Sequence, residues 1–154
     1  MSHKKKTATE AIQDEHICMQ RDRRMLIREL TKSLTEESFH DWKMEFLWRL
    51  RDFRFHVANH IDLEEDGGFM SEIVEMAPEK DTQIKKLAKE HEGLLDKIDQ
   101  LINELRPLTY NDNEKLDMIR THLKEMLRTM DRHESEENEL IQSVFYQDYG
   151  FSST

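Results

Sequence analysis

Cysteine, proline and glycine are scarce in this chain of 154 residues, which contains one Cys, two Pro and four Gly. A single Cys excludes an internal disulfide framework and any metal site built from several thiolates. So few turn-forming residues argue against an all-β or loop-rich fold. Basic residues are also in the minority, with 23 Lys and Arg against 33 Asp and Glu, and the net charge of −10 argues against a nucleic-acid partner.

Long apolar runs are missing as well. No stretch approaches the roughly 18 apolar residues that a membrane-spanning helix needs, so we expect no membrane partner. The basic start of the chain, residues 1–6, lacks a following apolar segment and does not look like a signal peptide, which favours a cytoplasmic location. Charged and apolar residues are abundant, at 36% each, and this mixture is typical of long amphipathic helices.

Apolar periodicity divides the chain into four long helical segments. Gly67 and Gly68 are expected to end the second segment, Pro78 breaks the chain after a short further stretch, and Pro107 ends the third. Ser38 is the predicted N-cap of the second helix, since its hydroxyl can accept from a first-turn N–H. The predicted helices are Thr9–Leu34, Phe39–Glu65, Thr82–Leu105 and Glu114–Tyr146, with one or two further turns over Phe69–Met76.

The connections between these segments are short, and we see no domain boundary among them. We therefore predict a single domain over residues 1–154, whose ordered core covers residues 10–148. Its fold class is all-α, an antiparallel up-down-up-down four-helix bundle with a short extra helix between helices two and three.

The apolar seams that face the bundle core are interrupted by histidine. In the second and fourth helices a Glu follows the seam His four residues later, as in His60 with Glu64 and His133 with Glu137, so both side chains share one helix face. The third helix carries His91 on its seam. A buried carboxylate without a partner carries a large desolvation penalty, and a shared metal ion would remove it. Imidazole and carboxylate together suit iron, manganese or zinc.

This pattern occurs twice along the chain. His16, the only His of the first helix, precedes His60 by nearly the same interval as His91 precedes His133. Two helical hairpins packed face to face would bring four His and two Glu to one level of the bundle. We therefore predict a two-metal site whose ligands are His16, His60, Glu64, His91, His133 and Glu137.

The other ionisable residues near these positions are given simpler roles. Arg23 is an awkward member of the seam that runs through His16, and Cys18 is expected to be an inert small hydrophobic residue. Solvated or structural positions are expected for His3, His40, His56, His122, Glu134 and Glu136. Glu65 is also expected to be solvated, but it is the residue that we consider as an extra ligand.

Four motifs resemble the hemerythrin-like, or HHE cation-binding, family. They are Asp14-Glu15-His16, His60-Ile-Asp-Leu-Glu64-Glu65, Lys89-Glu90-His91 and His133-Glu-Ser-Glu-Glu137, and the resemblance covers nearly the whole chain. It implies a four-helix bundle that holds two iron ions, which an oxo or hydroxo group can bridge. By position, the four His would be terminal ligands, and Glu64 and Glu137 would bridge the metals. The implied partner is a small ligand such as dioxygen, nitric oxide or peroxide, bound for sensing, storage or iron handling.

The sequence departs from the oxygen carriers of that family at two points. Leu95 stands where those carriers place a second third-helix His, and the fourth-helix spacing from His133 to Glu137 is four residues rather than five. Four His in place of five favour a site with open coordination positions over a simple oxygen carrier. Two alternatives stay open: a di-iron peroxidase, oxidase or nitric oxide-handling enzyme, and a structural or interaction bundle with a degenerate or zinc site. The sequence names no protein partner.

Overall fold

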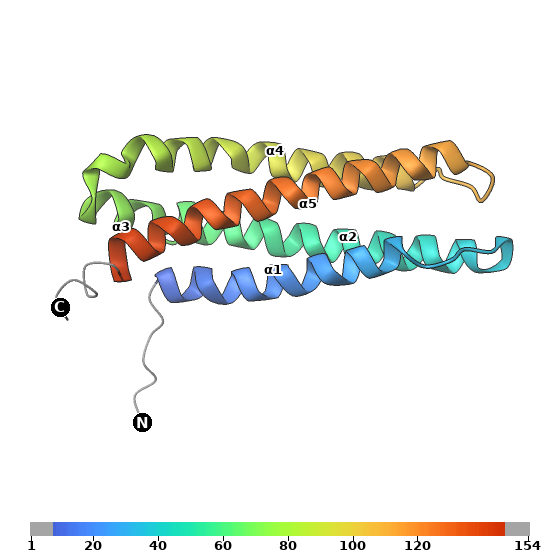
Figure 1. The fold of residues 1–154 in the computed structure, drawn as a ribbon, viewed down its shortest axis with the longest axis horizontal. Helices are drawn as coiled ribbons and strands as arrows, with labels where there is room; N and C mark the ends of the chain where they lie inside the picture. The colour runs from blue at the N-terminus through green and yellow to red at the C-terminus, as the bar shows by residue number, and fades with distance from the viewer. Residues whose placement is uncertain (1–7, 147–154) are drawn as a thin grey trace, which may run out of the picture.

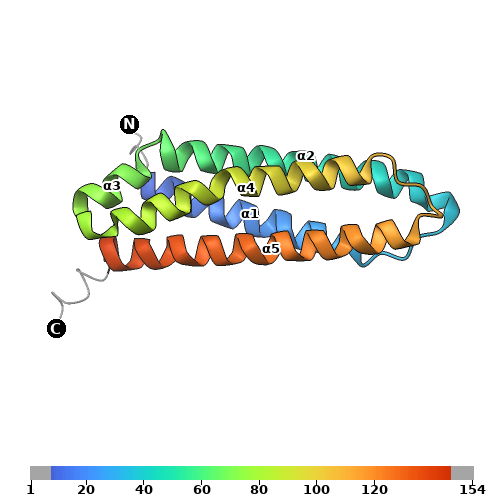
Figure 2. The same ribbon diagram turned by 90° about the horizontal axis from the view of Figure 1, so that it is seen from above.

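Four long helices run antiparallel to their neighbours in the computed structural model, which describes residues 8–146 (Figure 1). This arrangement confirms the all-α four-helix bundle. The short helix α3 and a 3₁₀ turn connect α2 to α4 at the end where α1 begins and α5 finishes (Figure 2). The elements are α1 (Ala8–Leu30), α2 (Glu36–Glu65), α3 (Phe69–Met76), the 3₁₀ turn (Pro78–Lys80), α4 (Asp81–Leu105), α5 (Asn113–Ile141) and a π-helical turn (Gln142–Tyr146).

The start of the second helix differs from the prediction. Its N-cap is Thr35 and not Ser38, because the Thr35 hydroxyl accepts from the Ser38 N–H (3.1 Å) and the Ser38 hydroxyl accepts from the Thr35 N–H (2.9 Å). This reciprocal pair is a capping box. Thr35 is extended, with φ −112° and ψ 165°, and the preceding helix ends at Leu30 rather than continuing to the predicted Leu34.

The turn between α2 and α3 depends on its two glycines, as predicted. Gly68 has φ 92°, a conformation that L side chains rarely adopt. Gly67 packs so closely on the preceding turn that a Cβ atom there would lie 2.5 Å from the carbonyl oxygen of Leu63. The chain therefore turns directly after the end of α2 at Glu65, which places Glu64 in the last turn of α2 and lets α3 cover the end of the bundle.

The apolar core is divided into two clusters by a layer of polar side chains. The larger cluster includes Met19, Val57, Leu94 and Met130 and extends away from α3. The smaller cluster, next to α3, is formed by Ile12, Phe69, Met70, Ile73, Ala77, Ile84, Leu87, Leu140, Ile141 and Val144. On each long helix, the seam passes from one cluster to the other through a His or Glu. The seam interruptions predicted from the sequence therefore lie together at one level of the bundle.

No described helix is both long and apolar enough to cross a membrane.

Candidate metal centre

The six predicted ligands lie together between the two apolar clusters, and we call them the polar layer. α1 contributes one residue, α2 two, α4 one and α5 two. All are buried, with at most 4% of any residue exposed: His16, His60, Glu64, His91, His133 and Glu137. The structure therefore brings together every residue that the sequence pattern selected. That these residues bind metal stays a prediction.

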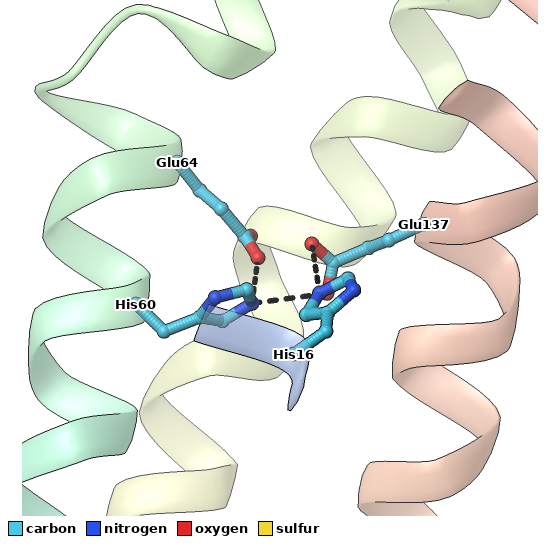
Figure 3. A group of neighbouring side chains, drawn as sticks. All are labelled: His16, His60, Glu64 and Glu137. Carbon is cyan, nitrogen blue, oxygen red and sulfur yellow. Dashed lines mark hydrogen bonds and ion pairs between the residues drawn. The ribbon is translucent and has the colours of Figure 1, made fainter. Parts of the chain in front are cut away.

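One half of the polar layer is formed by two imidazoles and two carboxylates (Figure 3). Each residue offers a ligand atom, and these atoms lie within 4.8 Å of one another. Nε2 of His60 contacts Oε1 of Glu64 and lies 3.5 Å from Oε1 of Glu137. Nε2 of His16 lies 3.8 Å from Oε2 of Glu137. A cation at this point would have ligands from α1, α2 and α5.

The other half uses the same two carboxylates with the second pair of imidazoles. Nε2 of His91 lies 2.7 Å from Oε2 of Glu64, and Nε2 of His133 lies 2.9 Å from Oε1 of Glu137. Ligand atoms of Glu64, His91 and His133 form a second group within 4.8 Å. Each carboxylate thus faces imidazoles of both halves, which is the arrangement that a carboxylate bridging two metal ions requires.

In three of the four imidazoles, the nitrogen that points away from the layer makes a hydrogen bond, and this bond fixes the orientation of the ring. When Nδ1–H donates to an acceptor, Nε2 presents its lone pair inwards, where a metal ion would accept it. Nδ1 of the fourth imidazole, His60, has no hydrogen-bond partner among residues 8–146. The oriented pairs are His16 with Asn138 (3.0 Å), His91 with Glu65 (3.0 Å) and His133 with Glu90 (3.1 Å).

The inward-facing atoms fit a bound cation. Within the described part of the chain, several of them are buried without any hydrogen-bond partner: Nε2 of His16, His91 and His133, both carboxylate oxygens of Glu64, and Oε2 of Glu137. Leaving such atoms unsatisfied is costly in a protein interior. A metal ion among nitrogen and oxygen donors would satisfy them together, and this donor set suits iron, manganese or zinc.

The electrostatics of the layer are strongly coupled. Burial by itself would lower the pKa of His60, but the carboxylates of Glu137 and Glu64 outweigh it and raise that pKa to about 10. The same competition, with Glu137 as the main partner, raises the pKa of His133 to about 9. Burial would raise the pKa of Glu137, yet contacts with Glu64 and the surrounding imidazoles hold it well below its usual range. Protons would therefore compete with a bound metal ion for the same atoms.

Glu65 lies outside the cluster of ligand atoms. Its Oε1 faces the outer nitrogen of His91, and its side chain is 43% exposed. Glu65 is therefore placed to orient His91 and does not itself face into the polar layer.

The prediction that Glu134 is solvated was wrong. Its two carboxylate oxygens each accept from the guanidinium of Arg23 at 2.8 Å, and both residues are buried. Nε of Arg23 also pairs with Asp131 at 3.0 Å. The presence of Arg23 on an apolar seam could have predicted this pair, since an arginine at a core position needs a buried acid to pair with.

The other residues considered from the sequence lie outside the polar layer. His40 and Cys18 are exposed, so Cys18 does not pack as a hydrophobic residue. His122 is half-buried and contacts Glu104 (3.1 Å), and His56 is half-buried against Asp22. Leu95 is partly buried against the larger apolar cluster. His3 lies outside the described residues.

Comparisons of the chain with protein-family models, with curated proteins and with solved structures find no match. The chain is an all-helical four-helix protein whose buried His and Glu groups form a candidate metal site.

Proposed function

We propose that the protein binds two iron ions in the polar layer and uses them to bind dioxygen or a related small ligand, for sensing, storage or iron handling. The observation that carries this proposal is that Glu64 and Glu137 each face imidazoles of both halves of the layer. A single ion would need only one half. The hemerythrin-like motifs of the sequence favour iron and a small gaseous ligand.

The donor count leaves room for that ligand. Four imidazoles and two bridging carboxylates supply about eight bonds, whereas two six-coordinate ions need about twelve. Ferrous iron, when bound, supplies electrons and open coordination positions to dioxygen or nitric oxide. The protein holds the ions in place through the outer hydrogen bonds from His16, His91 and His133.

The surroundings of the layer favour a small apolar ligand. Leu87 and Leu140 lie in the apolar cluster on one side, and Val57 and Met130 in the cluster on the other. These side chains exclude bulk water. The nearby Arg23 is bound to Glu134 and offers no free proton donor. The scarcity of proton donors favours binding of the small ligand over its chemical turnover.

Metal analysis with an optical spectrum tests the proposal. Protein purified without added metal should contain two iron ions per chain, and its absorption should change between air and reduction. Glu64→Ala or Glu137→Ala should abolish the two-metal centre and its absorption, because each carboxylate faces both halves. Glu65→Ala is the matched control and should retain two ions.

Less than one metal per chain, zinc alone, or a wild-type spectrum from either bridge variant would refute the proposal. Steady-state turnover of peroxide or nitric oxide by the iron-loaded protein would instead support the enzyme alternative.

A further inference from the structure

A separate group of metal-ligating side chains lies between α1 and α2. Asp22 comes from α1, and Asp52 and His56 come from α2; one ligand atom of each lies within 4.8 Å of the others. Nδ1 of His56 contacts Oδ2 of Asp22. Unlike the polar layer, this group is open to solvent, because the side chains of His56 and Asp22 are 30% and 19% exposed.

The helices bring these residues together for a simple reason. Asp52 and His56 are four residues apart on one helix, so they project from the same face. α1 packs along α2 and places Asp22 opposite His56. His56 is one turn from His60, and the group is therefore close to the polar layer along α2 but faces outwards.

The group carries an excess of negative charge. Burial by itself would lower the pKa of His56, but Asp22, Asp52 and Glu15 raise it, so three carboxylates act on one imidazole. Even a protonated imidazole leaves the group negatively charged. The guanidinium of Arg23 also interacts with Asp22, but it is bound to Glu134 and Asp131.

We propose that Asp22, Asp52 and His56 form a third cation site, which binds one divalent transition-metal ion such as Fe²⁺, Mn²⁺ or Zn²⁺. Two carboxylate oxygens and one imidazole nitrogen are a donor set for such ions, and water would complete the coordination. With three protein ligands and partial exposure, this site should bind its ion more weakly than the polar layer. A half-exposed site near a buried centre is suited to receive ions from solvent.

Titration of the metal-free full-length protein with Co²⁺ tests this proposal, with bound metal counted by elemental analysis after ultrafiltration. Wild type should bind three ions, and Asp52→Asn/His56→Gln should bind two. Glu64→Ala/Glu137→Ala, which disrupts the polar layer, should retain the one weaker ion. His122→Gln is the matched control, because His122 is half-exposed and pairs with a single carboxylate, and it should leave the count at three.

Equal counts for wild type and Asp52→Asn/His56→Gln would overturn the proposal and leave His56 and Asp22 as an ion pair only. Helical circular dichroism should be unchanged in that variant, since both substitutions are at half-exposed positions. The outcome does not depend on the two-iron proposal. If the polar layer binds no metal, wild type should still bind one more ion than the variant.

Discussion

Replacing Arg23 by methionine should destabilise the protein far more than loss of a surface ion pair. Glu134 is only 4% exposed, and both of its oxygens accept from Arg23 at 2.8 Å. The variant would leave a buried carboxylate without its charged partner. Removing one member of a buried pair costs about 3–5 kcal/mol of unfolding free energy. For a chain of this size, that loss corresponds to a melting temperature about 10 °C lower.

Urea unfolding of metal-free wild type, Arg23→Met, Glu134→Leu and the double variant measures this coupling directly. The double variant should recover most of the loss, because neither charge remains buried, and Asp131, at 64% exposure, is hydrated without its partner. Arg54→Met is the matched control, since Arg54 pairs with Asp99 at an exposed position, and about 1 kcal/mol or less is expected there. An Arg23→Met variant no less stable than Arg54→Met would refute the reasoning.

Three further outcomes are expected. Glu65→Ala removes the acceptor that orients His91 and should weaken metal affinity about 10–100-fold in a chelator competition, while the number of bound ions is unchanged. The pKa of His60 is raised from its unfolded value of about 6.5 to about 10. Its protonation therefore stabilises the metal-free protein fully below about pH 6.5, and this contribution is lost as the pH rises towards about 10. Urea midpoints of the metal-free protein should fall over that range and lie below those of the metal-loaded protein. Gly67→Ala should lower the unfolding free energy by at least about 1 kcal/mol, because the new Cβ would lie 2.5 Å from a backbone oxygen. Gly93→Ala is the comparison, since a Cβ at this helix-interior position would meet nothing within 4 Å, and it should raise the unfolding free energy by about 0.5–1 kcal/mol in the same assay.

The architecture could be predicted from the sequence because each long helix carries a periodic stripe of core-facing residues that is apolar over most of its length. Periodicity places a seam on one face whatever the neighbouring helix is, so the bundle follows from four such faces and short connections. Segment Phe69–Met76 was predicted with its correct bounds, because Gly68 permits the left-handed turn before it and Pro78 restricts the backbone after it. The level of the polar layer followed from the same seams, since a His or Glu on a core stripe has no other direction in which to point.

Other features depend on contacts between helices, and the sequence pattern alone does not specify them. Thr35 and Ser38 are both good N-cap residues one turn apart, and a choice between them leaves the apolar seam unchanged. Glu134 looks like a surface residue until α1 brings Arg23 beside it. Asn138 and Glu90 lie beside the seam, and whether they reach an imidazole depends on the rotation of α5 and α4. These are tertiary choices that periodicity does not encode.

Without a metal ion, the buried imidazoles and carboxylates of the polar layer interact directly with one another. The raised pKa values of His60 and His133 keep both imidazoles protonated near neutral pH, and the low pKa of Glu137 keeps its carboxylate ionised. The protons thus occupy lone pairs that a metal ion would otherwise take. Two apolar clusters pack on either side of the layer, so the six side chains are already assembled, and an arriving ion would have to displace these protons.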